Sequence, residues 1–349
     1  MPAVHGVRAF IALLACVLAA GSAAAQSPES FYRGKSVTLL IGTEPGGGYD
    51  LYARLLARHL GRHIPGNPSV VAQNMPGAAS TVLAGHLYSV APRDGLVLGA
   101  VQRGMPFNPL YTAEDSAAAR YDATKFTWIG SVTPETGIAL AMTSSGITRF
   151  DQLFEQELIV GAEGGGTSDS ELFARLTKAV LGTKLRIVTG YKGSTEVLLA
   201  MEKGEVNGQF NGGWAGVRNT IEPWLKQGKA TLLVQLAVRA DALFPGVPLI
   251  MDFAKTDAQR RILTLAFTPE LWGRPYVAPP GLPPDRARAL RESFLAALGD
   301  PDLLAEAKAQ GFEVKPLAGE EMARIIADAY AAPPDIIRAT RAAFRGEKQ

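Results

Sequence analysis

The sequence predicts a two-lobed α/β protein in which each lobe is a mostly parallel sheet flanked by helices. Short apolar stretches rich in β-forming residues alternate with segments of helical periodicity, which is typical of α/β folds. A strand, a glycine loop and a helix at residues 37–60 recur at 158–180, where GTEPGGGYDLYARL aligns with GAEGGGTSDSELFARL. A chain of 349 residues is also too long for one ordinary core and suits two lobes.

Residues 1–25 precede the first lobe and have the pattern of a signal peptide. Arg8 is their only formal charge, and an apolar run over residues 9–20 is followed by small residues that end at Ala25. We therefore expect export and cleavage after Ala25. The alternative is a lipoprotein signal, because residues 13–16 loosely resemble a lipobox. Cleavage after Ala25 would remove Cys16, the single cysteine of the chain, and would exclude thiol chemistry.

The first lobe is predicted to begin as β-α-β-α-β. Its first strand is too short for a helix and rich in β-formers, and the glycines at 46–48 lead into a helix with one apolar stripe. The expected strands are 37–41, 69–73 and 96–101, with helices after the first two. Consecutive strands joined by helices form a parallel sheet, so we expect ligands beyond the carboxyl ends of these strands.

The chain is then predicted to cross into a second lobe that repeats this alternation. Its expected strands are 128–132, which ends the first lobe, then 138–142, 158–161, 185–188, 206–210 and 231–237. Its expected helices are 149–156, 170–181, 195–203 and 215–226, and a capping box at 168–171 supports the second of them. A strand at 271–277 and a helical tail return to the first lobe. We assign residues 26–132 and 241–349 to the first lobe, and 133–240 to the second.

Each glycine loop is expected to sit at the N-terminus of a helix, where free N–H groups and the helix dipole favour an anion. Neither loop is a nucleotide motif. Thr167 stands where a P-loop needs its lysine, and Leu51 stands where the dinucleotide motif needs its last glycine. The alternative is that the glycines only permit tight turns. Because the two loops match, we expect two facing half-sites.

Composition and the remaining polar residues exclude several other functions. The 35 basic and 33 acidic residues are balanced and form no basic run, so we expect no nucleic-acid partner. No apolar run after residue 25 could span a bilayer, and transport would need a separate permease. His59 and His63 are spaced like metal ligands, but no catalytic glutamate lies between them, and the helix dipole explains them more simply. We expect no metal, no cofactor and no enzyme activity.

Two further residues stand at strand ends that face the expected cleft. Arg103 could hold a carboxylate with two hydrogen bonds, and Trp214 could form an apolar wall. The alternatives are a surface ion pair for Arg103 and core packing for Trp214.

An ordered set of short motifs runs along the whole chain after residue 25. It comprises KSVT at 35–38 with GGGYD at 46–50, QNMPGA at 73–78, APRDG at 91–95, YD at 121–122, YKG at 191–193 and GEV at 204–206. In this order the sequence resembles the Bug/TctC family, the extracytoplasmic solute receptors of tripartite tricarboxylate transporters. The resemblance implies a type II periplasmic-binding-protein fold, a periplasmic location and a cleft that closes on a carboxylate. It also implies two membrane permease subunits as partners, and we expect the receptor itself to be a monomer.

The resemblance extends the candidate site beyond the glycine loops to the N-x-P-G-A loop. The residues expected to bind the ligand are Gly46, Gly47, Gly48, Tyr49, Asp50, Asn74, Gly77, Ala78, Ala79, Ser80, Arg103, Gly165, Gly166, Thr167, Ser168, Tyr191, Asn207 and Trp214.

Two glutamates depart from a simple anion site. Glu44 and Glu163 each precede a glycine loop, where a carboxylate opposes binding of an anion, unless both point to solvent. If both face the cleft, the ligand must bring an ammonium, amide or hydroxyl donor beside its carboxylate. Two other functions stay open from sequence: a sensory receptor for a membrane kinase, and a transferase-like enzyme.

Overall fold

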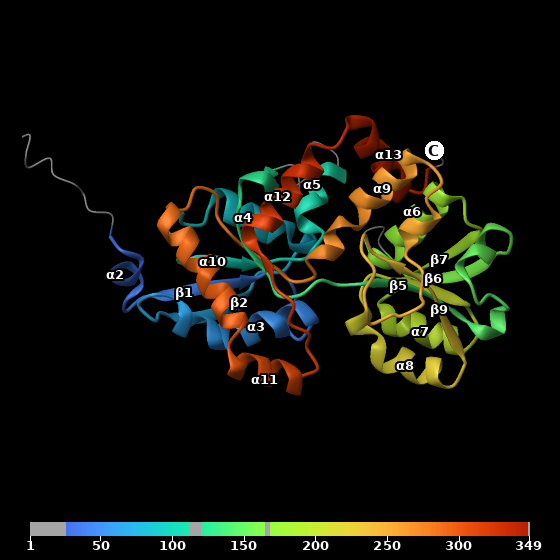
Figure 1. Ribbon diagram of the computed structural model, residues 1–349, viewed down its shortest axis with the longest axis horizontal. Helices are drawn as coiled ribbons and strands as arrows, with labels where there is room; N and C mark the ends of the chain where they lie inside the picture. Colours follow the sequence, from blue (N-terminus) through green and yellow to red (C-terminus); the bar gives the residue numbers. More distant parts are fainter. Residues whose placement is uncertain (1–25, 112–119, 165–167, 348–349) are drawn as a thin grey trace, which may run out of the picture.

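The computed structural model describes residues 26–111, 120–164 and 168–347, which form two α/β lobes side by side (Figure 1). The first sheet has the strand order β11-β4-β10-β3-β1-β2. Its strands are β1 (Ser36–Ile41), β2 (Ser69–Asn74), β3 (Val97–Ala100), β4 (Thr127–Ser131), β10 (Pro275–Ala278) and β11 (Leu317–Ala318). Strand β1 pairs in parallel with both β2 and β3, which confirms the expected parallel start, whereas β10 and β11 pair antiparallel.

The second sheet has the order β7-β6-β8-β5-β9 and takes all its strands from the middle of the chain. They are β5 (Gly137–Met142), β6 (Leu158–Glu163), β7 (Leu185–Tyr191), β8 (Gly208–Asn211) and β9 (Ala230–Leu236). Strands β6, β7 and β8 are parallel, and β5 runs antiparallel to its neighbours β8 and β9. Both sheets are therefore mixed but mostly parallel at the strands that carry the glycine loops, and the expected α/β class is confirmed.

Helices cover both sheets. Around the first sheet lie α2 (Pro28–Tyr32), α3 (Gly48–Leu60), α4 (Thr81–Ser89), α5 (Asn108–Tyr111), α10 (Pro284–Leu298), α11 (Pro301–Ala309) and α12 (Gly319–Tyr330). With the second sheet lie α6 (Asp169–Leu181), α7 (Ser194–Glu202), α8 (Arg218–Lys226), α9 (Asp257–Phe267) and α13 (Pro334–Phe344). No helix in the described part of the chain is long and apolar enough to cross a membrane.

Two elements differ from the sequence prediction. Residues 149–156 were expected to be an α-helix, but Phe150–Phe154 forms a short 3₁₀ helix. The side chain of Gln152 accepts hydrogen bonds from the backbone N–H groups of Thr148 and Arg149, which closes a tight turn at its start. The strand expected at 271–277 begins only at Pro275, because Thr268–Leu271 forms another 3₁₀ helix.

The C-terminal helices join the lobes. Helix α13 packs against α6 and α9 and also against α5 of the first lobe. Phe344 of α13 lies with its ring centroid 5.0 Å from that of Tyr111 of α5, and the neighbouring helices α6 and α9 meet through Phe173 and Phe267, whose centroids are 4.9 Å apart. Part of the C-terminal segment is therefore associated with the second lobe, although β10 and β11 belong to the first sheet. The lobe boundaries expected from the sequence remain a prediction.

Candidate functional site

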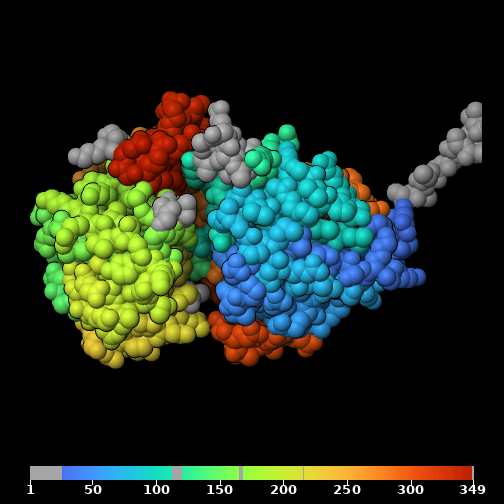
Figure 2. Space-filling model, turned by 180° about the vertical axis from the view of Figure 1, so that it is seen from behind, coloured from blue at the N-terminus to red at the C-terminus, as the bar shows by residue number. Residues whose placement is uncertain are grey.

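A cavity of about 480 Å³ lies between the lobes and takes its lining from both of them. Figure 2 shows the seam where the green and yellow second lobe meets the blue first lobe. The first lobe contributes the start of α3, Arg103 after β3, Arg274 before β10, and residues 310–312 after α11. The second lobe contributes the carboxyl ends of β6 and β8 and the starts of α6, α7 and α8, and Glu135 comes from the crossing segment.

Four helices begin at this cavity. Their first residues, Gly48 of α3, Asp169 of α6, Ser194 of α7 and Arg218 of α8, all line it. Ser168 caps α6 by accepting a hydrogen bond from the N–H of Glu171 at 3.4 Å. Helices α3, α7 and α8 have no side-chain cap, so their first N–H groups are left for other partners. The positive ends of several helix dipoles therefore converge on one space, which favours an anion.

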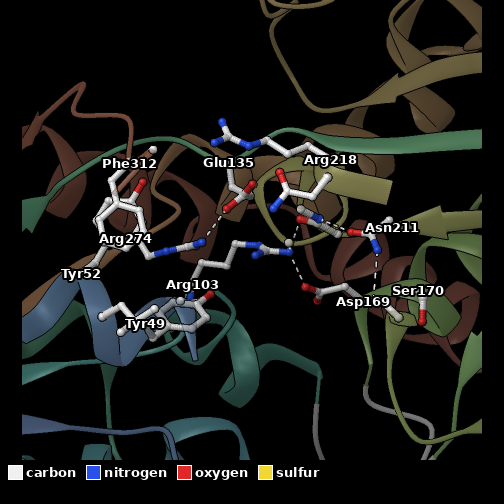
Figure 3. Close-up of a pocket in the computed structure, with 18 of the residues that line it drawn as sticks. Tyr49, Tyr52, Arg103, Glu135, Asp169, Ser170, Asn211, Arg218, Arg274 and Phe312 are labelled. Carbon is white, nitrogen blue, oxygen red and sulfur yellow. Dashed lines mark hydrogen bonds and ion pairs between the residues drawn. The ribbon is translucent and has the colours of Figure 1, made fainter. Parts of the chain in front are cut away.

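Arg103 lies near the middle of the cavity wall and links the lobes (Figure 3). Its backbone is held in the first lobe, where its N–H donates to the Tyr49 hydroxyl at 3.2 Å and its carbonyl accepts from Trp272 at 2.9 Å. Its guanidinium donates to Glu270 at 2.7 Å, and also to Asp169 and the Gly212 carbonyl of the second lobe.

Gly212 has to be a glycine for this contact. A side chain there would collide with Arg103 and Asp169. The segment after β8 can therefore contact the guanidinium of Arg103 only through a backbone carbonyl at a residue without a side chain.

Arg274 forms a second buried ion pair. Its guanidinium donates to Glu135 at 2.8 Å and to the carbonyl of Gly273 at 2.8 Å. The rings of Tyr49 and Tyr52 lie against it, with centroids 4.6 and 5.2 Å from the guanidinium carbon. Because both arginines are buried and paired within the protein, they shape the cavity before any ligand arrives.

The electrostatics around Arg103 are dominated by burial. Burial raises the pKa of Glu270 well above its usual value, and the nearby positive charge of Arg103 opposes this only in part. Burial also disfavours the charge on Arg103, but Asp169 and Glu270 together raise its pKa further. Arg103 is therefore charged at every accessible pH, and Glu270 is the group whose protonation can change.

Comparisons with known proteins identify the family and the fold of the chain. Residues 53–341 match the sequence pattern of the family described as "Tripartite tricarboxylate transporter family receptor", TctC. The chain belongs to this receptor family. Members of the family are solute receptors and not enzymes.

Three relatives illustrate the similarity. A Cupriavidus necator protein described as "UPF0065 protein in gbd 5'region" is 25% identical over 303 residues, which cover 84% of each chain. The crystal structure of a TctC solute-binding protein from Polaromonas has a TM-score of 0.67 at 16% identity and covers 88% of the receptor and 99% of that chain. A Rhodopseudomonas palustris protein with adipate has a TM-score of 0.60 at 20% identity, with 88% of the receptor and 97% of that chain covered. The structural matches show that the receptor has the periplasmic-binding-protein fold.

Of the residues expected to bind the ligand, Gly48, Tyr49 and Arg103 line the cavity. Gly165, Gly166 and Thr167 lie outside the described residues. The others are not among the residues that line it, and their part in binding stays a prediction: Gly46, Gly47, Asp50, Asn74, Gly77, Ala78, Ala79, Ser80, Ser168, Tyr191, Asn207 and Trp214.

Several of these residues hold the receptor's own loops in place. Asp50 is buried and accepts hydrogen bonds from the Gly46 N–H at 2.9 Å, from Arg54 at 3.0 Å and from Asn74 at 2.8 Å. Asn74 in turn donates to the carbonyl of Thr43 at 2.9 Å. The polar ends of β1 and β2 therefore fix the first glycine loop.

Ser80 holds the N-x-P-G-A loop of the first lobe in place. Ala78, Ala79 and Ser80 have positive φ angles of 45°, 51° and 67°. In this strained arrangement the buried hydroxyl of Ser80 donates to the Gly42 carbonyl at 2.9 Å and accepts from the Gln102 N–H at 3.0 Å. Ser80 thus connects the ends of β1 and β3.

Tyr191 and Trp214 belong to neighbouring surfaces. Tyr191 lines a separate depression beside α7, and Trp214 packs edge-on against Phe244 with ring centroids 5.1 Å apart. Of the two glutamates singled out from sequence, Glu163 lines the cavity, whereas Glu44 is exposed and does not.

Most of the residues that line the cavity were not predicted from the sequence, and Figure 3 shows several of them. The missed residues include Tyr52, Glu135, Asp169, Ser170, Ser194, Asn211, Arg218, Arg274 and Phe312. Asp169, Ser194, Asn211 and Arg218 stand at strand ends or helix starts of the second lobe, a position that could have pointed to them. Arg274 and Phe312 lie in irregular segments of the C-terminal part, where no periodic pattern marks them.

Proposed function

We propose that the receptor captures a small carboxylate-bearing solute in the cavity between its lobes and delivers it to a membrane permease of the tripartite tricarboxylate type. The observation that carries this proposal is the convergence of four helix N-termini, three of them without a side-chain cap, on one cavity with three arginines. Fixed N–H groups and guanidinium groups are the donors that carboxylates bind in proteins.

Arg218 is the proposed charged partner of the ligand carboxylate. It lines the cavity at the start of α8, and no hydrogen bond or ion pair to another residue of the described ranges occupies its guanidinium. Arg103 remains a proposed contact together with Gly48 and Tyr49, but its bonds to Glu270, Asp169 and Gly212 leave it less free to bind. The adipate found with the Rhodopseudomonas palustris relative supports a carboxylate as the ligand class.

We further propose that residues 1–25 direct the protein to the periplasm, where it acts as a monomer. The family description supports a role with a tripartite transporter, whose permease subunits are the proposed partners. The cavity volume also lies within the range that is usual for small-molecule sites.

A thermal-shift screen of di- and tricarboxylates, amino acids and aromatic acids tests the binding function. A ligand present at about 100 times its dissociation constant stabilises the folded protein by about 2.7 kcal/mol if it binds only that state. The best ligand is then titrated by calorimetry into the parent and into Arg218→Gln. Loss of one charge-assisted hydrogen bond, about 1.5–3 kcal/mol, predicts about 10- to 150-fold weaker binding.

Arg186→Gln is the matched control, because Arg186 is an exposed arginine of the same lobe that pairs with Glu157 away from the cavity. It should bind like the parent. If no carboxylate in the screen stabilises the protein, the proposed function is wrong. If Arg186→Gln weakens binding as much as Arg218→Gln does, the cavity is not the site.

A further inference from the structure

Most of the charged side chains that line the cavity form ion pairs with one another, but one arginine and one glutamate do not. Arg103 pairs with Asp169, and Arg274 pairs with Glu135. The two remaining lining charges are Arg218 and Glu163. Within the described ranges of the chain, neither has an ion-pair partner, and both are only half-buried. A ligand therefore meets one unpaired cation and one unpaired carboxylate.

Glu163 is held in place by a short relay of hydrogen bonds. The Ser194 hydroxyl donates to Oε1 of Glu163 at 2.6 Å and accepts from the Asn211 amide at 3.1 Å. The Asn211 oxygen is in turn fixed by the backbone N–H of Gly213 at 2.7 Å. These bonds leave Oε2 of Glu163 without a partner among the described residues. A fixed carboxylate with a free oxygen suits a cationic or N–H donor on the ligand.

Part of the opposite wall of the cavity, in the first lobe, is apolar. Tyr52 and Phe312 stack with ring centroids 4.3 Å apart and planes inclined by 21°. Leu51 lines the same wall with 40% of its surface exposed. An apolar body of the ligand can cover this wall, while its polar groups face the second lobe.

We infer that the ligand is a zwitterion, with a carboxylate bound at Arg218, an amino group bound at Glu163 and an apolar or aromatic body against Phe312. This inference rests on the proposed function and narrows its substrate class. A plain di- or tricarboxylate would bring a second negative charge towards Glu163, which has no cation within ion-pair distance among the described residues to offset the repulsion. Glu163 thus selects against fully anionic ligands of the same length.

Matched ligands separate these charge requirements. One set contains 6-aminohexanoate, hexanoate and adipate, which share a six-carbon chain. A second contains 4-(aminomethyl)benzoate, 4-methylbenzoate and terephthalate, and a third compares phenylalanine and leucine with their deamino acids. Each compound is titrated by calorimetry into the parent, Glu163→Gln and Glu157→Gln. Glu157 is an exposed carboxylate of the same lobe outside the cavity and serves as control.

In at least one set, the parent should bind the amino member about 10- to 150-fold more tightly than its matched monocarboxylate, which corresponds to one charge-assisted hydrogen bond. Glu163→Gln keeps an acceptor for Ser194 but removes the charge, so it should abolish this preference and improve binding of the dicarboxylate. Glu157→Gln should keep the preference. If Glu163→Gln does not fold, Glu163→Asp, which withdraws the carboxylate by one methylene, should reduce the preference instead.

Two results overturn the inference but leave the proposed function standing: dicarboxylates bind while no amino member has an advantage, or the advantage survives in Glu163→Gln. If no acid of any set binds and the wider screen also fails, the proposed function itself is wrong.

Discussion

Replacing Arg103 by methionine removes the cation that faces the buried carboxylate of Glu270. Arg103 is 7% exposed and Glu270 is 1% exposed, and the atoms Nε and Oε1 lie 2.7 Å apart. The second oxygen of Glu270 has no hydrogen-bond partner in the described chain. Asp169, the other acidic partner, has 45% of its side chain exposed and can turn to water. The cost of the substitution should therefore come mainly from Glu270.

Breaking one side of a buried ion pair typically costs about 3–5 kcal/mol, and we expect Arg103→Met to lower the free energy of unfolding by this amount at pH 8. The cost should be smaller near pH 5, because burial raises the pKa of Glu270 and the unpaired carboxyl can protonate there. Urea unfolding followed by circular dichroism measures both values in the absence of ligand.

The double variant Arg103→Met, Glu270→Met is the control for this reasoning. It removes both charges and should recover most of the lost stability, because apolar pairs often replace buried ion pairs without cost. Arg186→Met, at an exposed pair, should change the stability by less than about 0.5 kcal/mol. A single variant as stable as the parent, or a double variant less stable than the single, would refute the argument.

Three further predictions concern acid stability, alkaline stability and export. Burial opposes ionisation of Asp50, but the hydrogen bonds from Arg54 and the glycine loop outweigh it and lower its pKa, so its stabilisation is present above about pH 4 and lost in acid. Asp50→Asn should thus cost about 1–3 kcal/mol at pH 7 and progressively less as the pH falls below about 4, as measured by urea unfolding; a cost that stays constant as the pH is lowered would contradict this. Because folding raises the pKa of Glu270, its carboxyl contributes most to the stability of the folded state below about pH 4.3, where it is protonated, and this contribution falls as the pH rises. The free energy of unfolding of Glu270→Gln relative to the parent should therefore increase from pH 5 to pH 8. Intact-mass measurement of the exported protein should show cleavage after Ala25, whereas a lipid on Cys16 would show a lipoprotein instead.

Much of the fold could be predicted because its signals are local. The strand, glycine loop and helix motifs depend on short apolar runs and helical stripes, and β1 with α3 and β6 with α6 follow them closely. The short 3₁₀ turn at Phe150–Phe154 was harder to predict, because one side chain, Gln152, decides it through hydrogen bonds. The first sheet is mixed because β10, a strand of four residues late in the chain, inserts antiparallel between β3 and β4. The second sheet is mixed because β5 runs antiparallel to β8 and β9, which follow it far along the chain.

The candidate site was predicted only in part for a different physical reason. A polar residue at a strand end can serve a ligand or satisfy its own loop, and the sequence does not distinguish the two. Asn74, at the end of β2, hydrogen-bonds to Asp50 of α3, whereas Asn211, at the end of β8, faces the cavity. Arg274 and Phe312 reach the cavity only because the chain returns to the first lobe. No local sequence pattern predicts this return.

The most direct test of the central claim is a crystal structure of the receptor with the acid that binds most tightly in the thermal-shift screen. We predict that the ligand lies between the lobes, with a carboxylate oxygen about 2.7–2.9 Å from a guanidinium nitrogen of Arg218, the usual length of a charge-assisted hydrogen bond. A ligand bound elsewhere, or one in this cavity whose carboxylate contacts neither Arg218 nor the helix N-termini around it, would contradict the account.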